Sequence, residues 1–154
     1  MKIISVANQK GGVGKTTTAV NLAAVLASTK RKLLLIDLDS QGNATTASGL
    51  KKENTLLGLF EGKDINEIVV SSNNGYDVIP GGEDLVALEA HIRTEPKKGF
   101  IEESLSGLKY DFVVIDTPPA LNSLTVEALI SSVGTLVPLQ CEYYSLEGIS
   151  SLLN

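Results

Sequence analysis

A glycine-rich loop near the start of the chain carries residue types that bind phosphate groups. It reads Asn8-Gln9-Lys10-Gly11-Gly12-Val13-Gly14-Lys15-Thr16-Thr17. Glycines let the backbone curl so that successive N–H groups point into one concavity and can donate to phosphate oxygens. In such a loop Lys15 would place a positive charge against the β- and γ-phosphates of a nucleotide, and the Thr16 hydroxyl would ligate Mg²⁺. We therefore expect a nucleotide site with Mg²⁺ here.

Three aspartates at the ends of apolar runs are candidates for work at the same site. Asp37 and Asp39 end the run that starts at Leu33, and Asp116 follows four apolar residues. Ligands of open parallel sheets bind at the carboxyl ends of the strands. Residues i and i+2 of a strand point the same way, so Asp37 and Asp39 are expected to share a side. Asp116 is expected to hold Mg²⁺, directly or through a water. Strand-end capping is the alternative role for Asp37 and Asp39.

The elements that must position these residues alternate between strand and helix. Apolar runs predict strands at 3–7, 33–38, 76–80, 112–116 and 135–139. Helical spacing predicts helices at 15–29, 83–92, 97–107 and 122–132, with another beginning near Ser145. The glycine loop follows the first strand and opens the first helix, as a phosphate loop requires. We expect an α/β fold of the P-loop NTPase type, with a mostly parallel β-sheet and helices on both faces.

The composition fits a globular domain of ordinary size. Of 154 residues, 43% are apolar and 20% are charged. A membrane span is not expected, because there is no run of about 18 apolar residues. Cys141 is the only cysteine, which excludes an internal disulfide, and with one histidine it cannot build a zinc site from Cys and His alone. A cytoplasmic protein is the simplest expectation.

The charge of the chain argues against one class of partner. A formal net charge of −5 disfavours a protein that clamps nucleic acid with its whole surface. Short basic groups stand at 30–32, 51–52 and 97–98. Each is expected to be solvated surface.

The glycine loop resembles a variant of the Walker A motif. The strict pattern G-x-x-x-x-G-K-S/T is not met, because its first glycine would fall on Gln9. Instead the loop is similar to the deviant pattern K-G-G-x-G-K-S/T of the family that includes ParA, MinD, nitrogenase iron protein and the arsenical pump ATPase. The resemblance implies that Lys10 reaches across a dimer interface to the nucleotide of the other subunit; an exposed charge beside the loop is the alternative. It also implies that ATP is bound by Lys10, Gly11, Gly12, Val13, Gly14, Lys15, Thr16 and Thr17.

A second motif narrows the resemblance to ParA/Soj-type partition ATPases. Residues 37–45, D-L-D-S-Q-G-N-A-T, are similar to the D-x-D-P-Q-G-N-A-T segment of those proteins, with Ser40 in place of proline. The resemblance implies that Asp39 orients the attacking water and that Lys10, Lys15 and Asp39 are catalytic. It also implies that Thr16, Asp39 and Asp116 are the protein ligands of Mg²⁺. Replacement of the proline is expected to loosen the turn after Asp39 and to affect the hydrolysis rate.

Two further segments match the family. The loop Thr117-Pro118-Pro119 after Asp116 resembles a switch that senses the γ-phosphate, although a rigid turn explains its prolines equally well. The segment Glu142-Tyr143-Tyr144-Ser145-Leu146-Glu147-Gly148 resembles one that lies near the dimer interface.

The family resemblance also carries expectations about length and partners. The strand at 135–139 would be an uncovered apolar edge, which is an aggregation hazard. Residues 1–154 are therefore expected to form a single P-loop ATPase domain, incomplete at its C-terminus. The resemblance implies a homodimer on ATP binding, a ParB-like centromere-binding partner, and no membrane. Nonspecific DNA binding on the nucleoid is implied only for a complete relative, because the region that carries it is missing here.

Three alternatives remain open at the level of sequence. The chain could be a MinD-like membrane-associated ATPase, a nucleotide-binding or dimerisation module without turnover, or a non-functional remnant. Turnover would separate the enzyme from the module, and insolubility would indicate the remnant. The MinD-like ATPase would need a C-terminal amphipathic helix, which this chain cannot show.

Overall fold

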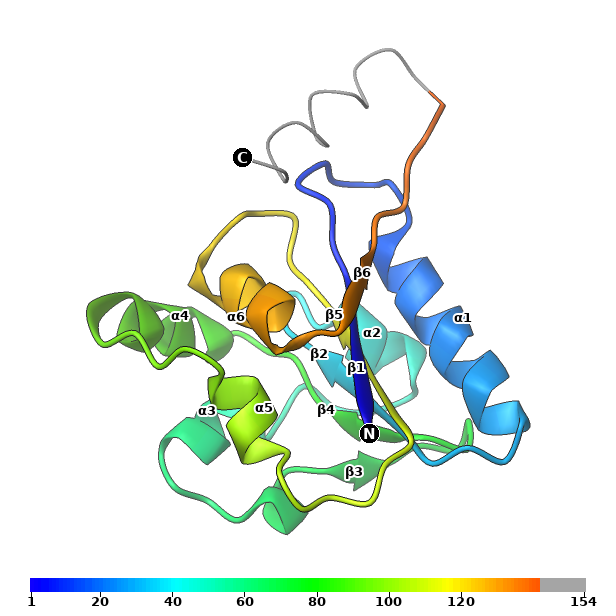
Figure 1. Cartoon of the computed structure of the whole chain (residues 1–154), viewed down its shortest axis with the longest axis horizontal. Coiled ribbons are helices and arrows are strands. Elements are labelled where there is room, and N and C mark those ends of the chain that lie inside the picture. The colour runs from blue at the N-terminus through cyan, green and yellow to red at the C-terminus, as the bar shows by residue number, and fades with distance from the viewer. Residues whose placement is uncertain (142–154) are drawn as a thin grey trace.

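The computed structural model describes residues 1–141 as one mostly parallel sheet with helices on both faces (Figure 1). Within these residues the strands are β1 (Lys2–Val6), β2 (Leu33–Asp37), β3 (Val70–Ser71), β4 (Asp77–Ile79), β5 (Phe112–Asp116) and β6 (Gly134–Leu136). The helices are α1 (Lys15–Ser28), α2 (Asn43–Ala47), α3 (Leu56–Phe60), α4 (Leu85–Thr94), α5 (Phe100–Ser104) and α6 (Ser123–Ser131), with a 3₁₀-helix at Ile65–Glu67. The predicted fold class is confirmed.

The register of the sheet brings the ends of three strands into one row. The strand order is β3-β4-β2-β5-β1-β6, and every neighbouring pair is parallel except β3 and β4. Asp116 at the end of β5 stands opposite Val6 of β1 on one side and Asp37 of β2 on the other. The glycine loop and the loops after Asp37 and Asp116 therefore leave the sheet at the same edge.

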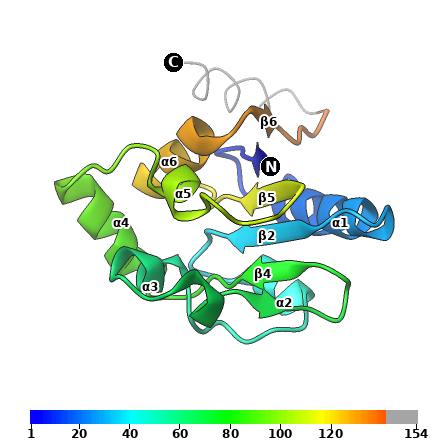
Figure 2. The ribbon, with the colours of Figure 1, turned by 60° about the horizontal axis from the view of Figure 1, so that its bottom comes forward.

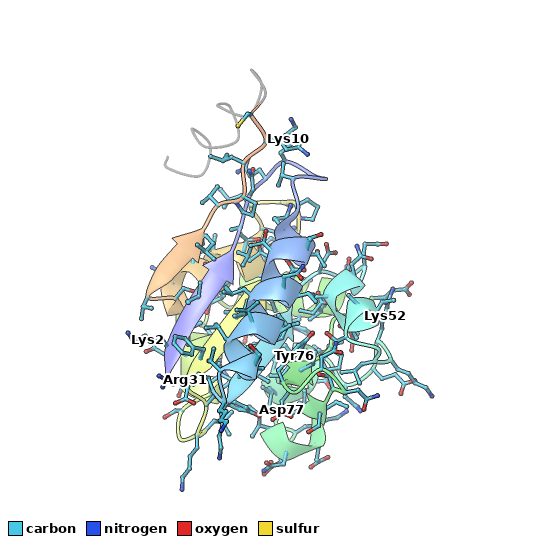
Figure 3. All side chains as sticks on the ribbon, turned by 90° about the vertical axis from the view of Figure 1, so that its right-hand side faces the viewer. Lys2, Lys10, Arg31, Lys52, Tyr76 and Asp77 are labelled. Carbon is cyan, nitrogen blue, oxygen red and sulfur yellow. The ribbon has the colours of Figure 1, made fainter. Side chains whose placement is uncertain are left out.

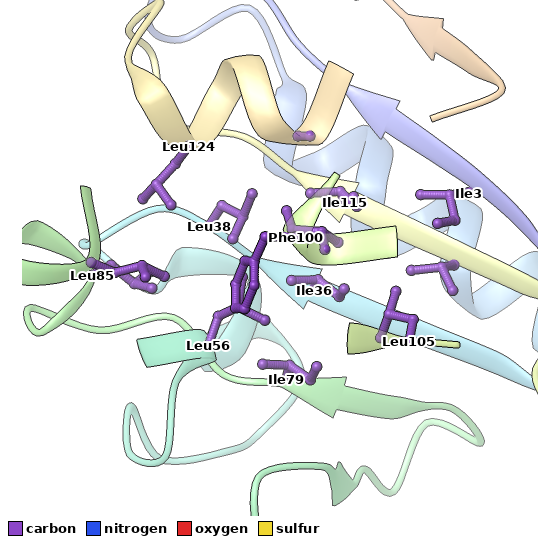
Figure 4. Packing of buried hydrophobic residues seen from close by; sticks show 14 of the residues in the cluster. Ile3, Ile36, Leu38, Leu56, Ile79, Leu85, Phe100, Leu105, Ile115 and Leu124 are labelled. Atoms are coloured by element: carbon purple, nitrogen blue, oxygen red, sulfur yellow. The ribbon is translucent and has the colours of Figure 1, made fainter. Parts of the chain in front are cut away.

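Alternation along β2 explains why helices cover both faces. Leu33 and Leu35 pack with Ala19 and Ala23 of α1. On the other face Leu34 and Ile36 belong to a larger cluster that includes residues of α3, α4, α5 and α6 (Figure 4). Figure 2 shows α1 and α2 on one side of the strands and α4, α5 and α6 on the other. Since β2 is fully buried, its ends are held rigidly where the candidate site lies.

The structure differs from the sequence expectations between residues 40 and 75. The sequence pattern predicts no element in that stretch, but it contains α2, α3, the 3₁₀-helix and β3. The missed helices are five residues long, too short for a helical period to stand out. The missed strand β3 has two residues and pairs antiparallel with β4. Short elements of this kind depend on tertiary contacts rather than on local pattern.

The last strand lies at the edge that the sequence predicts. Among residues 1–141, strand β6 is paired only with β1, and its three residues are exposed. The neighbouring Val133 is 75% exposed. Among the described residues no helix is both long and apolar enough to cross a membrane.

Candidate nucleotide-binding site

The glycine loop turns from β1 into α1 through two left-handed residues. Gly12 has φ +73° and Gly14 has φ +90°, a region that side chains with a Cβ rarely adopt. Gly14 is the N-cap of α1 and no side chain caps this end of the helix within residues 1–141. The first N–H groups of a 14-residue helix, with the positive end of its dipole, are therefore available to an anion.

A pocket of about 390 Å³ opens over this helix end. It is lined by Gly11, Gly12, Gly14, Lys15, Thr16, Thr17, Asp39, Gln41, Asn43 and Pro119. Most of the expected nucleotide-binding residues thus meet around one space. Val13 does not line it, because its side chain is buried under the loop. Gln41 and Asn43 were not expected as site residues, although both stand in the D-L-D-S-Q-G-N-A-T segment.

Lys15 is held inside the loop. Its side chain is 7% exposed, and its Nζ donates to the backbone carbonyl of Lys10 at 3.0 Å. Burial lowers the pKa of Lys15, while the negative charges of Asp116 and Asp39 act to raise it. The ammonium group is therefore positioned before any ligand arrives, and a phosphate would improve its electrostatic surroundings.

Thr16 and Asp116 form a pair beneath the pocket. The Thr16 Oγ1 donates to Asp116 Oδ2 at 2.7 Å. Burial raises the pKa of Asp116 to about 7, with the carboxylates of Asp37 and Asp39 adding to the rise and the Thr16 hydroxyl opposing it. Its other oxygen, Oδ1, is buried and has no hydrogen-bond partner among the described residues.

The orphaned oxygen of Asp116 fits a hard cation. A buried carboxylate oxygen without a donor is costly, and a cation would satisfy it. Within residues 1–141 no three His, Cys, Asp or Glu side chains converge into a metal cage. Mg²⁺ is usually bound through one or two carboxylates together with substrate phosphates, so an oxygen pair of this kind suits it.

Asp37 and Asp39, which the sequence predicts on one side, have different environments. Asp37 is fully buried, and its Oδ2 accepts from the backbone N–H and the hydroxyl of Thr45 at 2.8 and 2.7 Å. Asp39 lines the pocket and its Oδ1 accepts from the N–H of Gln41. Because β2 ends at Asp37, strand alternation does not extend to Asp39, and the shared side stays a prediction.

The loop after β4 packs against the Asp37 carboxylate and its partner Thr45. The N–H of Gly81 donates to the Thr45 hydroxyl at 2.8 Å. A Cβ at Gly81 would lie 2.6 Å from Asp37 Cγ and from the Asp39 carbonyl oxygen. Gly81 is therefore a tightly packed element of the site that sequence reasoning missed. The pair Gly81-Gly82 at the end of a strand is the sequence signal that could have indicated this close packing.

Lys10 lies at the outer side of the loop and does not line the pocket (Figure 3). Its N–H donates to the Asn8 side chain, and its carbonyl accepts from Lys15. The Asn8 Nδ2 in turn donates to the carbonyl of Pro138, and Gln140 Nε2 donates to the carbonyl of Gly12. The segment after β6 therefore holds the glycine loop from outside, a contact between positions about 130 apart that no local motif reveals.

The predicted switch loop divides between core and pocket. The Thr117 hydroxyl donates to the carbonyl of Val6 at 2.8 Å and is buried, as is Pro118. Pro119 is exposed and lines the pocket. The predicted interface segment that begins at Glu142 lies outside the described residues.

Comparisons with known proteins agree with this geometry. A family model described as an AAA domain, AAA_31, matches residues 1–154. The chain is 45% identical over 150 residues to the chromosome-partitioning ATPase Soj of Thermus thermophilus, covering 97% of this chain and 59% of that protein. It is 42% identical over 161 residues to the sporulation initiation inhibitor protein Soj of Bacillus subtilis, covering 99% and 64%.

A solved structure shows the same fold. Cobyrinic acid a,c-diamide synthase of Mycobacterium smegmatis, with bound ATP analogue and magnesium, matches with a TM-score of 0.92 at 32% identity, covering 99% of this chain and 66% of that one. The chain spans about three fifths of the length of the curated relatives it matches. It belongs to the AAA_31 family of AAA domains and is a relative of the Soj and ParA chromosome-partitioning proteins.

Proposed function

We propose that this chain binds Mg²⁺-ATP at the glycine loop and acts as the phosphate-handling part of a ParA/Soj-type partition ATPase. The observation that carries the proposal is a meeting of three features at one pocket: the uncapped start of α1, the buried ammonium of Lys15, and the Thr16–Asp116 pair. The first two suit an anion and the third suits a cation, which together describe a nucleotide with its metal.

The roles of the residues follow from where their polar atoms lie. The loop from Gly11 to Thr17 would surround the phosphates with N–H groups, and Lys15 would neutralise charge that develops as the terminal phosphoryl group leaves. Thr16 and Asp116 would hold Mg²⁺, with Asp39 at the rim of the same pocket. When bound, the ion would draw negative charge from the phosphate oxygens.

Asp39 is the proposed positioning group for the attacking water. Its carboxylate lines the pocket, whereas Asp37 is occupied by Thr45. Only one of the two aspartates therefore has access to a water in the pocket. The exposed Pro119 also lines the pocket and is the part of the predicted switch loop suited to sense the terminal phosphate.

Lys10 is proposed to act on a second subunit. It lies outside its own pocket, at the outer side of the loop, which suits a contact with the nucleotide of a partner in an ATP-dependent homodimer. Partitioning of a chromosome or plasmid in the cytoplasm, with a ParB-like protein and DNA as partners, is the proposed cellular role. The names of the relatives support the chromosome-partitioning part of this role.

A second candidate function is nucleotide binding without turnover. It is favoured by one observation, that the chain spans about three fifths of its relatives' length. In this case ATP would bind at the glycine loop of residues 1–154 without being hydrolysed.

Titration of the 154-residue chain with a fluorescent ATP analogue and Mg²⁺ tests the common part of both functions. Lys15→Ala should weaken binding by about 100-fold, because the phosphates lose a desolvated charge partner. Lys51→Ala, which removes an exposed charge elsewhere, is the matched control, with circular dichroism as the check on folding. Equal affinity of the Lys15 variant and the unmodified chain would refute the site.

Phosphate release under the same conditions separates the two functions. Turnover that depends on Mg²⁺ supports the ATPase, and saturable binding without turnover supports the module. Sedimentation with and without Mg²⁺-ATP tests the dimer. An ATP-dependent dimer that persists in Lys10→Ala would remove the proposed role of Lys10.

A further inference from the structure

A second and larger pocket, of about 520 Å³, lies at the other end of α1. Its walls come from three separate segments: residues 27–33 at the end of α1 and the turn into β2, residues 75–77 before and in β4, and residues 108–110 before β5. In Figure 3, Arg31, Tyr76 and Asp77 lie toward the end of the molecule opposite Lys10. We call this space the basic cleft. From the length of α1, it is about 20 Å from the glycine loop.

Four cationic side chains surround the basic cleft. They are Lys30, Arg31, Lys32 and Lys109, and all four residues are exposed. In the described part of the chain none of the four makes an ion pair. The chain as a whole carries a net charge of −5, so a group of four cations in one hollow is a strong departure from the average surface.

The carboxylates nearby are occupied by neutral donors. Asp77 accepts from the Tyr110 hydroxyl and from the Ser71 hydroxyl, both at 2.7 Å. Asp111 accepts from the backbone N–H of Lys32 at 2.8 Å. Burial, and then the neighbouring Asp77, raise the pKa of Tyr110, so the phenol stays protonated and keeps donating at neutral pH. The two carboxylates keep their negative charges, so the four cations outnumber them and the cleft retains a net positive charge.

The backbone conformation of Lys30 is unusual for a lysine. Lys30 has φ +63°, the left-handed conformation that follows a helix end and favours glycine. Asn54 is the other non-glycine residue with positive φ in the described chain, and asparagine tolerates this region well. Glycine would adopt this conformation with less strain, so a Lys30→Gly substitution separates backbone strain from the charge of the side chain.

A structural explanation accounts for only part of the cluster. Cations after a helix C-terminus complement the negative end of its dipole, which would explain residues 30–32. It does not explain Lys109, which arrives from a segment nearly eighty positions later along the chain and lines the same hollow. The sequence predicts solvated surface for residues 30–32 because the basic run is short, and the three residues are indeed exposed. Their proximity to Lys109 cannot be seen locally.

We propose that the basic cleft binds a phosphorylated small molecule. The guanidinium of Arg31 can bind phosphate with two parallel hydrogen bonds, and the lysines add point charges around it. Leu33, Leu108 and the Tyr110 ring give the cleft apolar wall for the rest of the ligand. A concave hollow of this volume suits a small ligand. Duplex nucleic acid is disfavoured, because it requires an extended basic face. This site is independent of the function proposed for the glycine loop.

Calorimetric titration of the Lys15→Ala chain with inorganic pyrophosphate tests the proposal, because the phosphate site at the glycine loop is weakened there. Saturable binding is expected. Adding Arg31→Ala and Lys109→Ala should weaken it by about tenfold or more, as charge-assisted hydrogen bonds are lost. Adding Lys51→Ala and Lys63→Ala removes the same charge from exposed positions elsewhere and should leave it unchanged. Equal weakening of pyrophosphate binding by both pairs of substitutions would overturn the proposal. It would indicate that the anion is attracted by the overall charge of the protein rather than bound in the basic cleft.

Amide chemical shifts locate the bound pyrophosphate. Changes at residues 30–32 and 108–110 are expected, and changes confined to residues 11–17 would overturn the proposal. A 20-base-pair DNA duplex is the second probe. Binding of the duplex at residues 30–32 without binding of pyrophosphate would replace the small molecule with nucleic acid.

Lys30→Gly gives a test in which two readouts move in opposite directions. Glycine relieves the left-handed strain, so the unfolding midpoint without ligand should rise. Pyrophosphate affinity should fall, because one cation is removed. Asn54→Gly, at the other left-handed position, is the matched control and should not change affinity. A Lys30→Gly chain that keeps full affinity would contradict the role of this side chain.

Discussion

At the N-terminal end of α1 one cation, Lys15, is almost fully buried, whereas at the C-terminal end four cations stand exposed around the basic cleft. The buried charge is held by a backbone carbonyl within the same loop. The exposed charges come from segments far apart in the sequence. At one end the charged group thus lies in a contiguous, rigid loop. At the other end the fold brings together charged groups from separate segments.

This contrast predicts which end of α1 has the stronger charge interactions and which end responds more to pH and substitution. A buried group interacts strongly and resists screening by salt, but its own charge is costly when no partner is present. Exposed groups are cheap to maintain and contribute weakly one by one. The glycine-loop end should therefore respond steeply to pH and single substitutions, and the basic cleft should respond in small steps.

The largest expected effect is a pH dependence of stability caused by Asp116. Its pKa is about 7 in the folded chain against 3.8 as the reference value. Between these values the unfolded chain releases the proton and the folded chain keeps it, so the contribution of Asp116 is present below pH 4 and is lost as pH rises through 7. The loss is on the order of 4 kcal/mol when complete.

Urea unfolding from pH 4 to 8 without Mg²⁺ measures this loss, with Asp116→Asn as the comparison. The variant should lack this part of the pH dependence and be the more stable protein at pH 8. Asp111→Asn, at an exposed position beside the basic cleft, controls for the substitution itself. Parallel pH curves for the unmodified chain and Asp116→Asn would break the proposed contrast between the two ends.

Asp39→Asn should stop turnover while leaving ATP bound. If the chain hydrolyses ATP, the rate should fall by about 100-fold or more, since the water loses its positioning group while Lys15 and the loop remain. Single-turnover phosphate release measures the rate, and the fluorescent titration measures affinity. Asp84→Asn, at an exposed position that does not line the pocket, is the control. Equal turnover in Asp39→Asn would move the role to another residue.

The same contrast explains what sequence reasoning could and could not find. The glycine loop was predictable because its groups lie within ten consecutive residues and their chemistry is local. The environment of Asp37 was not, because it depends on Thr45 in a five-residue helix that tertiary contacts maintain. Long strands and helices were predicted to within a few residues. The basic cleft was missed, because Lys109 joins residues 30–32 only after the sheet forms.

Gly81→Ala should lower the stability of the protein, and the effect should be of intermediate size among these predictions. A Cβ there would overlap Asp37 Cγ and the Asp39 carbonyl, so backbone must move and the free energy of unfolding should fall by about 2 kcal/mol. Nucleotide affinity should fall with it, because the loop carrying Asp39 shifts. Gly134→Ala is the matched control, since a Cβ there meets nothing within 4 Å. Equal stability of both variants in urea would show that the loop behind Asp37 is more pliant than its packing indicates.

The smallest expected effect belongs to the basic cleft. Tyr110→Phe removes one hydroxyl, and the lost hydrogen bond to Asp77 should lower the free energy of unfolding by about 1 kcal/mol. The freed carboxylate oxygen can then turn toward the cleft cations, so pyrophosphate affinity should also fall, by about threefold. Asp77→Asn in the Tyr110→Phe chain removes that carboxylate charge and should restore affinity without restoring stability. Calorimetry and urea unfolding of the same samples separate the two readouts. If Tyr110 serves packing alone, Tyr110→Phe would lower stability without changing pyrophosphate affinity. Adding Asp77→Asn would then have no lost affinity to restore.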